Sequence, residues 1–80
     1  MSLEYQDRLN QMVEYIKNNV DMDEVGYTYS RMCIERCSLR MENPTLYNKI
    51  SDLIDDFGCD NDFDVSDISV EEIFDELFAD

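Results

Sequence analysis

Apolar residues recur every three or four positions along most of this 80-residue chain, which is the spacing that gives a helix one buried face. Four segments carry the pattern. Its apolar members are Tyr5, Leu9, Met12, Val13, Ile16 and Val20; then Val25, Tyr29, Met32, Cys33 and Cys37; then Leu46, Ile50, Leu53, Ile54 and Phe57; and last Val70, Ile73, Phe74, Leu77 and Phe78. The spacing predicts an all-α fold, a small compact bundle of three main helices plus a short C-terminal helix, in a single domain over residues 1–80.

Capping residues divide these segments. Asn43 followed by Pro44 predicts a helix start, because Asn caps the first turn and Pro needs no hydrogen bond there. Gly58 is expected to end that helix in a left-handed turn, and Ser69 to begin the last helix. We expect the first two helices over about 3–19 and 24–38. Residues 26–29 also have strand-like character, but a lone strand would lack a partner.

Charge is distributed very unevenly. Residues 1–40 hold seven acids and five bases, whereas residues 41–80 hold thirteen acids and one base, Lys49. Twelve acids and no Lys or Arg lie between Ile50 and Asp80. A chain with a formal net charge of −14 is not expected to bind nucleic acid directly or an anionic membrane, since both require a positive patch. The apolar content of 44% predicts a folded domain rather than a disordered acidic tail.

The acidic half predicts an electrostatic docking surface for a protein with a basic surface. A surface of this kind presents a field similar to that of a phosphate backbone. In size and charge the chain resembles small acidic helical proteins of phages and mobile elements, including DNA-mimic inhibitors. The resemblance implies a non-enzymatic protein-interaction module. The candidate partner-binding residues lie opposite the apolar positions of the last two helices: Asp52, Asp55, Asp56, Glu71, Glu72, Asp75 and Glu76. The alternative is a solvated surface that only keeps the domain soluble.

The segment between the last two helices supports a second hypothesis, calcium binding. Counted from Asp60, oxygen-bearing side chains occupy positions 1, 3, 5, 7 and 12, as in an EF-hand loop. The candidate ligands are Asp60, Asp62, Asp64, Ser66 and Glu71. Val65 stands where that loop normally has Gly, and Asp67 stands where it normally has an apolar residue. Both departures favour a solvated acidic turn.

Catalysis is not expected. The chain contains no His, so no imidazole can activate a thiol or hydroxyl, and no carboxylate pair stands out from the acidic background. Three cysteines, Cys33, Cys37 and Cys59, cannot form a complete disulfide framework. We expect them to be reduced, small buried residues of a cytoplasmic protein that is a monomer or a homodimer.

Two further segments have two interpretations each. Tyr27, Tyr29 and Arg31 could form a contact surface, although ordinary packing of a Tyr-rich helix is the favoured reading. Residues 73–78 could insert an apolar face into a partner's groove, although packing on the chain's own core is favoured.

Overall fold

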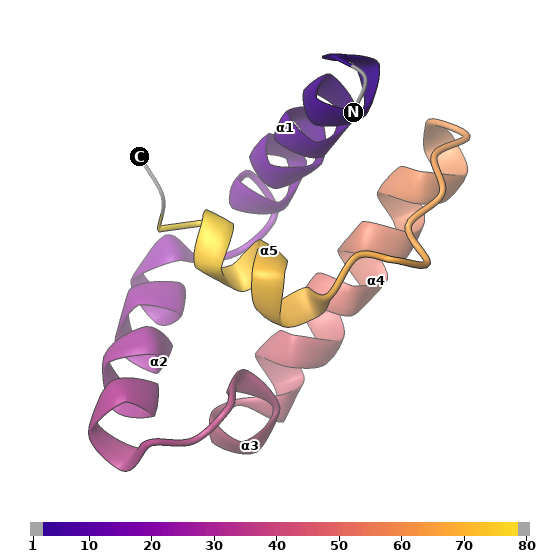
Figure 1. Cartoon of the computed structure of the whole chain (residues 1–80). Helices are drawn as coiled ribbons and strands as arrows, with labels where there is room; N and C mark the ends of the chain where they lie inside the picture. The colour runs from indigo at the N-terminus through magenta and orange to yellow at the C-terminus, as the bar shows by residue number, and fades with distance from the viewer. Residues whose placement is uncertain (1–2, 79–80) are drawn as a thin grey trace.

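The computed structural model describes residues 3–78, and this part of the chain folds into five helices. The helices are α1 (Leu3–Lys17), α2 (Met22–Glu35), α3 (Leu39–Glu42), α4 (Pro44–Asp60) and α5 (Val70–Glu76) (Figure 1). Residues 3–78 contain no strand. The all-α prediction is confirmed, and residues 26–29 are helical.

Helix α4 is the centre of the packing, since it contacts α1, α3 and α5. Its buried side chains are spaced as the sequence predicts: Leu46, Ile50, Ile54 and Phe57. Helix α5 crosses the face between α4 and the first two helices (Figure 1) and buries Val70, Ile73 and Phe74, and Leu77, which follows it, is also buried. Residues 73–78 therefore pack on the core of the chain, which is the interpretation that the sequence analysis favoured.

The predicted caps at Asn43 and Ser69 are present, and Asp21 supplies a third. The Asp21 side chain accepts a hydrogen bond from the backbone N–H of Asp23. The Asn43 side chain accepts one from Leu46. Ser69 Oγ accepts from the N–H groups of residues 71 and 72. Each satisfies a donor that the first helical turn leaves unpaired, which explains why these starts could be located from sequence.

Gly58 corrects one prediction. It neither ends α4 nor has a positive φ, and α4 continues to Asp60. A Cβ at this position would lie 2.9 Å from the Phe63 carbonyl oxygen and 3.0 Å from a Val65 methyl. The glycine is therefore needed because the following loop folds back against the helix.

Helix α2 also ends earlier than expected. Arg36 adopts the left-handed conformation at φ 55° and terminates the helix after Glu35. Ser38 then caps α3, a four-residue helix that the periodicity did not predict. Cys37 lies in the connection, so it does not share a helical face with Cys33 as the sequence suggested.

The helices within residues 3–78 are too short or too polar to cross a membrane.

Candidate functional site

The predicted partner-binding acids lie on the outer sides of α4 and α5. Asp52, Asp55, Asp56, Glu72, Asp75 and Glu76 are exposed, and Glu71 is partly buried in the first turn of α5. We call these seven residues the acidic surface set. Both apolar faces pack inward, so the expectation that these carboxylates can stay in solvent while the helices pack is met for six of them.

The two helices present their acids in different surroundings. Glu72, Asp75 and Glu76 border an open hollow of about 290 Å³ that Tyr5 and Leu9 of α1 also line. Asp55 borders a second open hollow, between α4 and residues 63–66. The acids of α4 and those of α5 therefore border two separate open hollows rather than one shared cleft.

None of these carboxylates has a basic partner within residues 3–78. Both ion pairs of that part of the chain involve Arg31, with Glu35 and Glu42. The base that reaches toward the loop after α4, Arg8, donates to the amide oxygen of Asn61 at 3.2 Å. The negative charge of the C-terminal half is consequently not neutralised by the fold.

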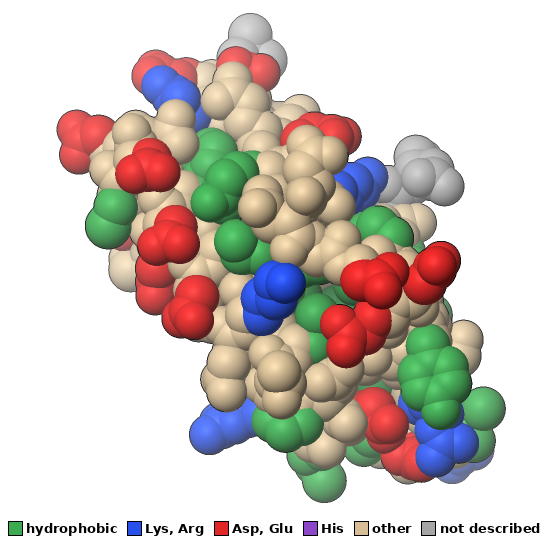
Figure 2. All heavy atoms as spheres, turned by 180° about the vertical axis from the view of Figure 1, so that it is seen from behind, with side chains coloured by type: hydrophobic (Ala, Val, Ile, Leu, Met, Phe, Trp, Pro, Cys, Tyr) green, Lys and Arg blue, Asp and Glu red, His purple; other side chains and the backbone are tan. Residues whose placement is uncertain are grey.

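The charge also shows on the surface of the molecule. Figure 2 shows the face opposite to that of Figure 1, where acidic side chains follow one another along the flank formed by α4 and the loop after it. Basic side chains on this face are fewer than acidic ones. A basic partner surface would meet these carboxylates without displacing an internal cation.

The five candidate calcium ligands do not converge. Asp60 is the last residue of α4, and Asp62 adopts a left-handed conformation at φ 51°. The Asp64 carboxylate accepts hydrogen bonds from the N–H of Ser66 at 3.0 Å and from its hydroxyl at 2.7 Å. These bonds to its charged form lower the pKa of Asp64. The loop acids form no group of three with ligand atoms within 4.8 Å of one another, among the residues that the structure describes.

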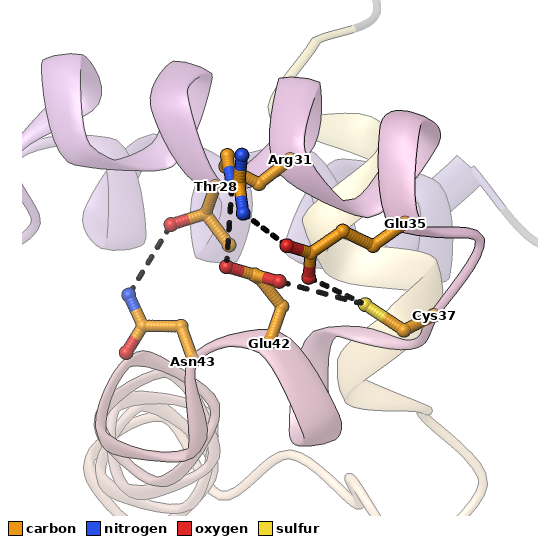
Figure 3. A network of polar contacts seen from close by, with 6 residues as sticks. All are labelled: Thr28, Arg31, Glu35, Cys37, Glu42 and Asn43. Carbon is orange, nitrogen blue, oxygen red and sulfur yellow. Dashed lines mark hydrogen bonds and ion pairs between the residues drawn. The ribbon is translucent and has the colours of Figure 1, made fainter.

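Sequence reasoning missed a cluster that does converge, at the junction of α2 and α3 (Figure 3). Ligand atoms of Glu35, Cys37 and Glu42 lie within 4.8 Å of one another. Arg31 pairs with Glu35, and its Nε lies 3.9 Å from Glu42 Oε2. Arg31, Glu35 and Cys37 come from the segment predicted as one helix over 24–38, and Glu42 comes from α3. They meet because the left-handed Arg36 ends α2 and lets the chain turn. Helical spacing in the sequence does not indicate such a turn.

The two acids and the thiol of this cluster affect one another. Hydrogen bonding with Glu42 is the main reason that the pKa of Glu35 lies above its ordinary value, and Arg31 opposes the rise. Partial desolvation, followed by the neighbouring carboxylates, raises the pKa of the Cys37 thiol. A thiol held protonated is a poor nucleophile. Because Arg31 already offsets the acids, the cluster is best described as a polar junction that joins α3 to α2.

Of the remaining predictions on single residues, some agree with the structure and others do not. Cys33 and Cys59 are exposed and Cys37 is partly exposed, so the expectation of buried cysteines was wrong. Tyr29 packs on Phe78 with ring centroids 4.4 Å apart, as favoured. Tyr27 does not pack, since it is 68% exposed.

Comparisons with protein-family models, with curated proteins and with solved structures found no match to this chain.

Proposed function

We propose that this protein is a non-enzymatic interaction module whose acidic C-terminal half docks on a basic surface of another protein. The observation that carries the proposal is the run of twelve acids without a Lys or Arg from residue 50 to 80. Within the described part of that run, no carboxylate forms an ion pair.

Solubility alone would be served by mixed charges, which repel one another less. Unpaired acids of one sign lower the stability of a small domain through self-repulsion. They also accelerate and orient the approach of a positively charged partner. A partner surface that normally binds nucleic acid fits this chemistry, since both ligands present closely spaced negative charges.

The first experiment is capture of partners from the source cell, with the protein as bait at low and at high salt. Reversal of Asp55, Asp56 and Asp75 to Lys should abolish capture, because it inverts charge on both α4 and α5. The matched control reverses Glu4, Asp7 and Glu14, which are exposed acids of α1. It changes the net charge by the same amount and should retain the partner.

The captured partner should dissociate as salt rises and should be released by added duplex DNA if its basic surface is a nucleic-acid site. Circular dichroism must show the same helical spectrum for both variants. A partner that resists high salt and binds the α4–α5 reversal equally well would contradict the proposal. Equal loss with both reversals would show that only net charge matters.

A further inference from the structure

The open hollow that α1 and α5 line, called here the α1–α5 hollow, is bordered by three acids and by no base. Asp75 and Glu76 follow Glu72 by three and four residues, which places all three on one side of α5. All three are exposed. None of them forms an ion pair within residues 3–78, so the fold supplies no countercharge to these carboxylates.

The remaining lining of the α1–α5 hollow is largely apolar. Tyr5 and Leu9 line it from α1, Ile68 from the segment before α5, and Ile73 from α5 itself. Leu9 and Ile68 are half-buried, and Ile73 is buried. A group that enters the hollow therefore meets both carboxylates and hydrocarbon, which suits a positive charge carried on an apolar stem.

The size of the hollow and its acceptors favour one arginine side chain. The volume of about 290 Å³ lies at the lower end of the range for ligand pockets, so the hollow holds a side chain rather than a helix. A guanidinium has five N–H donors in one plane and can serve two carboxylates at once. It is also more weakly hydrated than the ammonium of lysine, so its contact with the apolar lining costs less.

We propose that the α1–α5 hollow receives an arginine side chain from the basic surface of the protein partner. The proposal rests on the proposed function and adds to it the contact that anchors the partner. Charge complementarity identifies the occupant, since three carboxylates without a countercharge border an apolar space of side-chain size. The other hollow that the acidic surface set borders contains only Asp55 of that set, so the anchoring contact is assigned to α5.

Titration of the isotope-labelled full chain with Nα-acetylarginine methylamide tests the site without the partner. Amide NMR shifts at about 0.15 M salt provide the measurement, because long-range attraction is then screened. The shifts should saturate with a Kd of about 1–10 mM, since the contacts are exposed. They should be largest at Tyr5, Leu9, Ile68 and residues 72–76. The corresponding lysine derivative should bind about fivefold more weakly, and the uncharged citrulline derivative should cause no saturable shift.

A triple variant of α5 identifies the acceptors. Glu72→Gln, Asp75→Asn and Glu76→Gln combined should weaken binding of the arginine derivative at least about tenfold, and should weaken capture of the partner. The matched control combines Asp52→Asn, Asp55→Asn and Asp56→Asn on α4. It changes the net charge by the same amount and should bind the arginine derivative as the parent does.

The absence of a saturable shift with the arginine derivative would overturn the proposal, and so would equal binding of the lysine derivative. A partner that binds the α5 triple variant as tightly as the parent would also overturn it, and would leave the docking of the acidic half standing. The proposed function fails on a different result, equal capture by the parent and by the reversal of Asp55, Asp56 and Asp75, which the titration does not measure.

Discussion

Gly26 and Gly58 both lie inside helices, but they affect stability in opposite ways. A Cβ at Gly26 would have no atom within 4 Å, whereas one at Gly58 would meet backbone and side-chain atoms of the following loop. Gly26 therefore costs helix propensity without a packing requirement. Gly58 is fixed by the close approach of Phe63 and Val65.

Gly26→Ala should raise the free energy of unfolding by about 1 kcal/mol. Gly58→Ala should lower it by about 1–2 kcal/mol, since the steric strain outweighs the gain in propensity. Urea denaturation followed by circular dichroism measures both. A stabilising Gly58→Ala would mean that the 63–65 segment does not rest on α4.

Cys37 differs from the other two thiols in its surroundings. Its raised pKa means that the folded state favours the thiol over the thiolate. The resulting stability is fully present below the unfolded-state pKa and is lost as pH rises through the folded-state pKa. At neutral pH the exposed Cys33 and Cys59 should react with a disulfide reagent faster than Cys37.

The reaction should show two fast thiols and one slow thiol, and Cys37→Ser should remove the slow phase. The slow phase should accelerate with a pH midpoint above the ordinary 9.0 of a thiol. Three thiols with equal rates would show that neither desolvation nor the carboxylates of Glu35 and Glu42 raise the pKa of Cys37.

At the scale of elements, Asn43 joins three helices. It is the C-cap of α3 and the N-cap of α4. Its amide nitrogen also donates to Thr28 Oγ1 of α2 at 3.2 Å (Figure 3). Thr28 is only 2% exposed, so its hydroxyl depends on partners within the protein.

Asn43→Ala should lower the free energy of unfolding by about 2–3 kcal/mol, from the lost cap and from the buried hydroxyl left unpaired. Asn43→Asp keeps an oxygen for Leu46 and an acceptor for the Thr28 hydroxyl, and should cost less. Thermal unfolding of the two variants measures the difference. Equal losses would show that only the amide donor matters.

The loop between α4 and α5 is expected to bind divalent ions only weakly, because its carboxylates do not converge. Calcium and magnesium at millimolar concentration should raise the melting temperature by the same small amount. Asp60→Ala and Glu71→Ala should each leave that rise nearly unchanged. A saturable rise specific to calcium that either variant abolishes would instead support the EF-hand resemblance.

Much of the element structure was predictable, since periodicity and caps are local signals. The starts at Asn43 and Ser69 and the buried positions of α4 follow from residues a few places apart. The end of α2 at Arg36 was not, because left-handed backbone at an Arg has no compositional signature. The polar junction depends on tertiary packing, so spacing could not locate it. The acidic surface set could be identified from the sequence because charged side chains opposite an apolar helical face are expected to be exposed whatever the tertiary packing.

At the scale of the whole molecule, the unpaired acids form a repulsive field within a particle of 37 × 23 × 22 Å. At about 0.01 M salt the screening length is about 30 Å, comparable to the molecule, and at about 0.15 M it falls to about 8 Å. Carboxylates of α4 and α5 that lie more than about 8 Å apart therefore repel one another strongly only in dilute buffer.

The melting temperature should rise between about 0.01 M and 0.3 M sodium chloride, because salt screens this repulsion. The Asp55, Asp56 and Asp75 reversal to Lys should show a smaller rise, since it removes part of the field. Scanning calorimetry at several salt concentrations provides the measurement. A melting temperature independent of salt would mean that the acids are compensated within the fold.

Because Asn43 caps both α3 and α4, it limits where residues can be inserted into the chain. The backbone N–H of Asn43 closes α3, and its side chain caps α4. A residue inserted next to Asn43 would break one of these two caps, and it would move the Asn43 amide away from Thr28. The segment before α5 holds no helix cap at Ser66 and Asp67, which are both exposed, and an insertion there would open only the turn bond from the Ile68 N–H to the Val65 carbonyl. Loop extensions, tags and reporter peptides therefore belong between residues 66 and 67, where added chain can leave the molecule without unpairing a helix end.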